Sequence, residues 1–143
     1  MKNIGLFTSN KSEWETPQEF FDELDKEFHF TLDVCGLAKN TKHKNYISPE
    51  GNGSLDVSWA TYKMGFSNNK NICWMNPPYG REIGKWIKHA YEEYLKGATV
   101  VCLLPARTDT KWWHNYCMKA DEQFLFQVLM RNVLDFRSSK VMY

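Results

Sequence analysis

The run Asn76-Pro77-Pro78-Tyr79 carries residue types that suit chemistry on a flat amine. The exocyclic amine of a nucleobase is a poor nucleophile, because its lone pair is delocalised into the ring. Two hydrogen-bond acceptors aimed at its N–H bonds would draw it toward a tetrahedral, more reactive geometry. The Asn76 side-chain oxygen and the Pro77 carbonyl can supply these acceptors, and the two prolines would keep the loop stiff. Tyr79 can stack on a base that has flipped out of a duplex.

This pattern predicts a site that transfers a methyl group to a nucleobase amine. The alternative is a proline-rich turn, with an aromatic lid, between a strand and a helix. The same two acceptors would serve adenine N6 or cytosine N4, so these residues alone leave the target base open.

A second set of candidates follows another apolar run. Arg107 can pair with a phosphate, and Trp112 or Trp113 can stack on a base. Alternatively, Arg107 pairs with Asp109 at the surface and the tryptophans belong to the core. A short basic run either contacts a DNA backbone or forms a solvated loop. This run comprises Lys39, Lys42, His43 and Lys44.

Composition narrows the classes of protein to consider. The 143 residues suit a single domain, and a formal charge of +1 excludes a uniformly basic nucleic-acid coat. No apolar run approaches the roughly 18 residues of a membrane span, and the first ten residues lack a signal-peptide core. The four cysteines form no C-x-x-C pair and the four histidines show no metal-ligand spacing, so we expect no metal site. We therefore expect reduced cysteines and a cytoplasmic protein.

Hydrophobic periodicity indicates the elements that position these residues. Thr16 can cap a helix whose first residue is Pro17, and Glu19 completes a capping box. A strand follows over residues 30–35, and residues 36–70 are expected to be mostly loop.

The second half of the chain alternates strands and helices. The apolar runs at 72–75 and 100–104 are typical of buried strands. A helix from 83 to 95 lies between them, and Gly97 is expected to stop it. A short helix capped by Asp109 or Thr110 and a strand-like run at 124–129 come next.

Strands that alternate with helices predict an α/β fold with right-handed crossovers and a mainly parallel sheet. Such sheets place their sites at the carboxyl ends of strands. Three segments meet that description, namely residues 33–36, 76–80 and 105–109.

Four stretches of the chain resemble the small phage or prophage DNA N6-adenine methyltransferases of the Dam type. They are residues 12–17 (SEWETP), 30–35 (FTLDVC), 74–81 (WMNPPYGR) and 103–114 (LLPARTDTKWWH). The resemblance implies a small Rossmann-like sheet with helices on both faces. It also implies methyl transfer from S-adenosylmethionine to adenine N6 in double-stranded DNA, in the cytoplasm of a bacterial host. Residues 1–13 are expected to form a loose arm and residues 14–143 a single methyltransferase-like domain.

The resemblance also implies roles for individual residues. The catalytic loop is Asn76, Pro77, Pro78 and Tyr79. The cofactor side is expected to include Asp33, Cys35, Gly36, Thr16 and Pro17, although Asp33 has an alternative role as an ordinary capping acid. DNA is expected to contact Tyr79, Arg107, Lys111 and Trp112. Glu50 and Asp56 are further candidates for the cofactor ribose, and no spacing rule chooses between them.

Two departures from the family pattern stand out. The glycine-rich loop after the first strand is represented only by Gly36, so cofactor binding cannot be argued from a G-x-G-x-x-G pattern. The C-terminal hairpin is expected to be altered or truncated, because a Gly-Arg-Leu-Lys-Phe-Gly-like strand is missing after residue 123. A lost strand would expose a sheet edge, and residues 124–143 are therefore expected to contribute to a homodimer contact. A catalytically degenerate relative that binds DNA or protein is the rival hypothesis.

Overall fold

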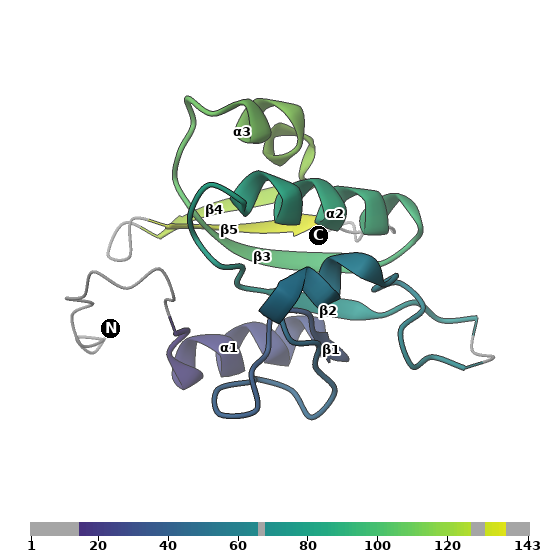
Figure 1. The fold of residues 1–143 in the computed structure, drawn as a ribbon. Coiled ribbons are helices and arrows are strands. Elements are labelled where there is room, and N and C mark those ends of the chain that lie inside the picture. The colour runs from purple at the N-terminus through teal and green to yellow at the C-terminus, as the bar shows by residue number, and fades with distance from the viewer. Residues whose placement is uncertain (1–14, 66–67, 127–130, 137–143) are drawn as a thin grey trace.

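Three parallel strands form the part of the sheet that carries the predicted loops (Figure 1). The computed structural model describes residues 15–65, 68–126 and 131–136, so the arm expected at residues 1–13 lies outside the described residues. The sheet has the strand order β1-β2-β3-β5-β4, and β1 pairs with β2 and β2 with β3 in parallel. The strands are β1 Leu32–Asp33, β2 Ile72–Met75, β3 Thr99–Pro105, β4 Glu122–Phe126 and β5 Arg131–Phe136; the helices are α1 Gln18–Phe28, α2 Ile83–Leu95 and α3 Lys111–Asn115, with 3-10 turns η1 Glu50–Asp56 and η2 Cys117–Lys119.

The C-terminal hairpin, expected to be altered or truncated, is not truncated. The returning strand β5 is present, and it lies between β3 and β4 with antiparallel pairing to both. Two ladders of backbone hydrogen bonds hold β5, and backbone pairing does not require the family's glycine and lysine. The strand-like run expected at 124–129 is β4, which spans Glu122–Phe126, and residues 127–130 lie outside the described residues.

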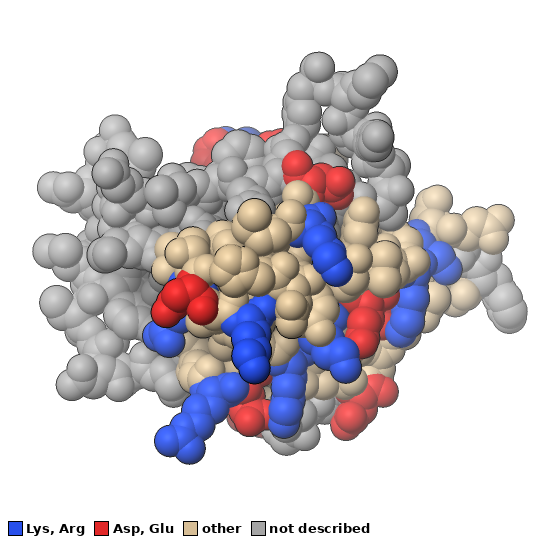
Figure 2. All heavy atoms as spheres, turned by 90° about the horizontal axis from the view of Figure 1, so that it is seen from above, with Lys and Arg blue, Asp and Glu red and all other residues tan. Residues whose placement is uncertain are grey.

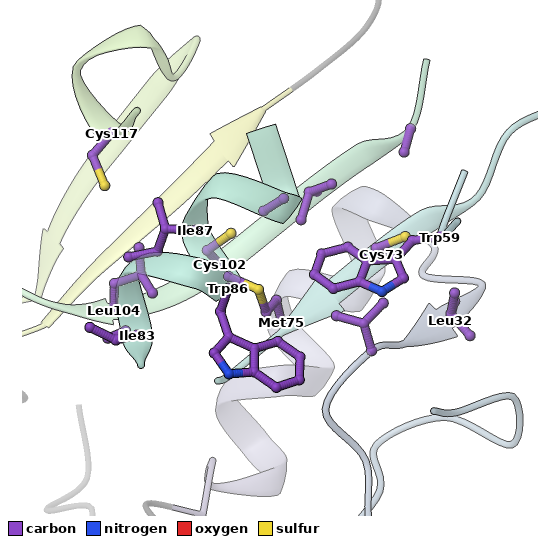
Figure 3. Close-up of a cluster of buried hydrophobic side chains, with 14 of the residues drawn as sticks. Leu32, Trp59, Cys73, Met75, Ile83, Trp86, Ile87, Cys102, Leu104 and Cys117 are labelled. Atoms are coloured by element: carbon purple, nitrogen blue, oxygen red, sulfur yellow. The ribbon is translucent and has the colours of Figure 1, made fainter. Parts of the chain in front are cut away.

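The side chains of β3 alternate between two apolar clusters, so helices cover both faces of the sheet. Val100, Cys102 and Leu104 face α2 (Figure 3). Val101 and Leu103 face α1 on the other side. This alternation confirms the expected buried strand and the α/β layering.

The α1 side of the core is aromatic. Phe21 and Phe28 are buried on the inner face of α1, as their helical spacing predicts. The Phe21 ring stacks on Phe30 at 5.3 Å between centroids and meets the edge of Trp74 at 5.5 Å. Because Trp74 belongs to β2, these rings fix α1 against the strand that leads into the Asn-Pro-Pro-Tyr loop.

The helix boundaries agree with the sequence except at the start of α1. The predicted helix over 83–95 is α2, and Gly97 follows it with φ of 103° as expected of a helix stop. Thr110 caps α3 by accepting a hydrogen bond from the Trp113 N–H at 3.3 Å. By contrast, α1 begins at Gln18, Pro17 is its N-cap residue, and no side chain caps it. The Thr16 hydroxyl is therefore not used for capping.

A buried carboxylate joins α2 to the chain before β2. Glu93 is fully buried and accepts hydrogen bonds from Ser58 Oγ at 2.8 Å, the Ala60 N–H at 2.8 Å and Lys96 Nζ at 2.6 Å. Burial acts to raise the pKa of the Glu93 carboxyl. The hydrogen bonds from Lys96, Ala60 and Ser58 outweigh burial, so the pKa lies below its ordinary value. Glu93 is thus a charged anchor of the fold.

None of the helices in the described part of the chain has the length and apolar character needed to cross a bilayer.

Candidate active site

A cleft of about 370 Å³ opens at the carboxyl ends of β1 and β2, where the parallel topology predicts a site. Its size falls in the range of small-molecule sites. The chain segment before α1, the loop after β1 and the loop after β2 all contribute to its walls. The lining residues are Glu15, Thr16, Asp33, Cys35, Leu37, Lys39, Asn40, Lys42, Pro49, Trp74, Asn76, Pro77 and Pro78.

Asn76 lies in this cleft directly after β2. Its Nδ2 donates a hydrogen bond to the Thr16 Oγ1 at 3.0 Å, although the two residues are 60 positions apart. The Asn76 Oδ1 atom is buried and accepts no hydrogen bond from the described residues. The amide is therefore anchored through its nitrogen, and its oxygen is the end that can accept from a ligand.

Pro77 and Pro78 lie in the cleft, whereas Tyr79 does not. Pro77 and Pro78 line the cleft and end β2, since neither can donate to a sheet ladder. Tyr79 is half-buried against the α2 cluster and does not line the cleft. Its hydroxyl donates to the Leu103 carbonyl at 3.2 Å, one residue beyond the point where β2 stops pairing with β3.

Asp33 lies in the cleft wall, and its carboxylate organises the loop after β1. Oδ1 accepts from the Cys35 N–H at 3.0 Å, and Oδ2 accepts from the Lys42 N–H at 2.9 Å and the Thr41 hydroxyl at 3.2 Å. Burial raises the pKa of Asp33, while these three donors and the Lys42 charge act against that rise. Asp33 thus has the capping role that the sequence left open, and through these hydrogen bonds it holds the loop that forms one wall of the cleft.

The neighbours of Asp33 divide between cleft and loop interior. Cys35 lines the cleft, but burial and the Asp33 carboxylate raise the pKa of its thiol well above the ordinary value. A protonated thiol is a weak nucleophile, so Cys35 contributes surface rather than reactivity. Gly36 does not line the cleft. A Cβ at Gly36 would lie 2.6 Å from Thr41 Oγ1, so glycine is required by close packing inside the loop.

Sequence reasoning missed several lining residues. Trp74 lies two positions before Asn76, and the period of two along a strand places both on the same face. Glu15 brings a carboxylate to the cleft from the segment before α1. Lys42, which was expected to contact a DNA backbone or to lie in a solvated loop, brings an ammonium group from the loop after β1. Lys42 Nζ donates to Gln18 Oε1 at 3.3 Å, so it joins the loop after β1 to the start of α1. Only the alternation in β2 was readable from the sequence, because the other residues meet through tertiary contacts.

The residues expected to contact DNA lie outside the cleft. Arg107 and Lys111 are exposed after β3, and neither forms an ion pair with a described residue, so the alternative Arg107–Asp109 pair is absent there. Trp112 is half-buried and packs edge-on against Trp113 at 6.1 Å between centroids. Trp113 belongs to the core, which confirms half of the alternative interpretation of the two tryptophans.

Comparisons with known proteins agree with the motifs. The family model for DNA N-6-adenine-methyltransferase (Dam) matches residues 5–137. A DNA N-6-adenine-methyltransferase of Haemophilus phage HP1 (strain HP1c1) is 32% identical over 120 residues, which are 82% of this chain and 63% of the phage protein. The chain thus matches less than two thirds of that relative's length. No solved structure matches the chain. Because the family model matches residues 5–137 of the 143, the chain belongs to the DNA N-6-adenine-methyltransferase (Dam) family.

Proposed function

We propose that this protein transfers a methyl group from S-adenosylmethionine to the N6 amine of adenine in double-stranded DNA. The observation that carries the proposal is the Asn76 amide, which lies in the cleft with its Nδ2 end bound by Thr16. Membership of the family supports adenine as the target base. The phage origin of the relative supports a place of action in a bacterial cytoplasm.

The chain's own groups prepare the amine for attack. Asn76 Oδ1 and the Pro77 carbonyl accept hydrogen bonds from the two amine hydrogens and so favour a nucleophilic geometry at nitrogen. The prolines hold both acceptors in place. Tyr79 ends this loop and would stack on a flipped base, while its hydroxyl donates a hydrogen bond to the Leu103 carbonyl.

The cleft fits the cofactor in its chemistry. S-adenosylmethionine is zwitterionic and carries a purine, and when bound it supplies an electrophilic methyl group. The cleft offers the Glu15 carboxylate, the Lys42 ammonium group and the half-buried apolar side chain of Leu37. Asp33 holds the loop that presents Lys42.

Calorimetry tests the cofactor proposal. S-adenosylmethionine should bind at one site per chain, and Asp33→Ala should weaken binding about tenfold, the worth of one or two net hydrogen bonds. Lys26→Gln, on the outer face of α1, is the matched control and should bind normally. A folded wild-type chain that takes up no cofactor would refute this part of the proposal.

The charge pattern indicates where DNA approaches. Four exposed cations follow the parallel strands, and none forms an ion pair with a described residue: Lys39, Arg81 and Arg107 in the loops after β1, β2 and β3, and Lys111 at the start of α3. We call these four residues the cationic rim. On the side that carries α2, Lys and Arg lie interspersed with Asp and Glu (Figure 2).

The ion pairs of α2 explain this contrast. Lys85 pairs with Glu82, and Lys88 pairs with Glu92 at 3.6 Å. Their charge is locally neutralised, whereas the cationic rim is available to phosphates. The edge of the sheet that holds the cleft is thus the face we expect DNA to contact.

A single assay tests the proposed reaction. The full chain is incubated with labelled S-adenosylmethionine and duplex DNA, and the methylated base is identified. N6-methyladenine is the expected product, and Asn76→Ala should lower turnover by roughly 10²–10³-fold with less effect on cofactor binding. N4-methylcytosine would correct the target base. DNA binding without any transfer would favour the degenerate relative and refute the enzyme.

A further inference from the structure

The residue before α1 reaches into the catalytic loop. Thr16 is only 3% exposed and lines the cleft, and its hydroxyl is the hydrogen-bond partner of Asn76 Nδ2. A threonine at this position is normally explained as a helix cap. Here α1 has no side-chain cap, so capping does not account for the hydroxyl.

Thr16 is held independently of Asn76. The Phe21 N–H donates to the Pro17 carbonyl at 3.2 Å, which ties the residue after Thr16 to the first turn of α1. Phe21 in turn is buried against Trp74 of β2. The β-branched Thr16 side chain also has few rotamers, so its hydroxyl is a fixed reference point beside the loop.

We propose that Thr16 is a positioning residue, which sets the rotation of the Asn76 amide so that Oδ1 faces the substrate amine. The terminal torsion of an asparagine has broad preferences, so the backbone alone does not choose which end of the amide faces the cleft. In the structure the Thr16 hydroxyl oxygen accepts the hydrogen bond from Nδ2, so the amide is held by its nitrogen end. This inference rests on the proposed function, because it assigns Thr16 a role in the same transfer step.

A merely structural Thr16 would behave differently from a positioning one. If the bond only held α1 to the loop, its loss would lower stability and leave the kinetics of the folded enzyme unchanged. If it orients the amide, its loss lowers kcat while the KM for the cofactor stays the same. The effect should also depend on the presence of Asn76.

The experiment compares Thr16→Val, which keeps the shape and removes the hydroxyl, with Thr16→Ser, which keeps the hydroxyl. Thr16→Val should lower kcat about tenfold, the worth of one net hydrogen bond, and Thr16→Ser should restore most of the rate. In an Asn76→Ala background, Thr16→Val should have no further effect. Thr61→Val, at an exposed position that does not line the cleft, is the matched control and should keep the wild-type rate.

A second measurement reads the amide directly. In ¹⁵N-labelled protein, the Asn76 side-chain NH₂ signals, identified by their loss in Asn76→Asp, should shift with Thr16→Val and much less with Thr16→Ser. A Thr16→Val enzyme with normal kcat, or equal losses in the wild-type and Asn76→Ala backgrounds, would overturn the inference while leaving the proposed function intact. A wild-type chain that methylates no amine would overturn both.

Discussion

The strength of DNA binding should depend steeply on salt, because it is assigned to four cations that pair with no carboxylate among the described residues. Each phosphate contact contributes about −0.9 to the slope of log K against log salt on a duplex. Four contacts from the cationic rim give a slope of roughly −3.6. Between 50 and 200 mM salt, the affinity should therefore fall by roughly 150-fold.

Removing one charge has a calculable effect. Arg107→Gln leaves three contacts, so the slope should become roughly −2.7 and the loss over the same salt range roughly 40-fold. Lys88→Gln, whose cation is already paired with Glu92, is the matched control and should keep the wild-type slope. Fluorescence anisotropy with a short labelled duplex, at several salt concentrations and without cofactor, measures the slope for each variant. If Arg107→Gln and Lys88→Gln change the slope equally, the cationic rim is the wrong surface.

Three further predictions concern the anchors of the fold and the assembly. Above the pKa of an unfolded glutamate, Glu93 should contribute fully to the free energy of unfolding, and this contribution is lost as the pH falls through its lowered folded pKa. Urea unfolding should show Glu93→Gln destabilised by about 1–2 kcal/mol at pH 7, with the difference shrinking in acid; a constant difference would contradict the lowered pKa. Tyr79→Phe should cost about 0.5–1.5 kcal/mol of stability by losing the bond to Leu103 but change the methylation rate little, whereas Tyr79→Ala should also weaken a flipped-base complex by roughly 1–3 kcal/mol; equal kinetic losses would refute stacking. The homodimer expected through residues 124–143 stays a prediction, with β4 as the outer strand available for it, and light scattering that shows a monomer at tens of micromolar would refute it.

The features that were predictable from the sequence are those encoded by local periodicity. An apolar run that ends at a proline is a clear signal of a buried strand and of its last residue. The position of β2, and of Asn76 in the cleft, therefore followed from this run and the prolines alone. The 3.6-residue spacing of apolar side chains likewise predicted α2. The short polar side chains of Asp109 and Thr110 predicted the start of α3 to within one residue, and Thr110 is the cap.

The features that escaped prediction depend on contacts between distant residues. Thr16 has one hydroxyl and two plausible partners, a helix N–H and the Asn76 amide, and only the packing of α1 on β2 decides between them. A glycine after a strand can either let a ligand approach the backbone or fit a closely packed loop, and the sequence does not tell which. The short distance from a Cβ at Gly36 to the Thr41 side chain shows that Gly36 is of the second kind. The family motif does not predict whether β5 forms, because backbone pairing tolerates many sequences.

The position of β5 has a consequence for how the chain reaches its native state. β5 follows β4 in the chain but fills an interior place in the sheet, between β3 and β4. A nascent chain that has emerged only as far as β4 cannot yet attach that strand through its native neighbour. Such long-range closure is slow compared with helix formation, and it leaves the β3 edge exposed to other chains until β5 has emerged. Premature termination shortly before Arg131 would therefore remove two strands from the sheet rather than one.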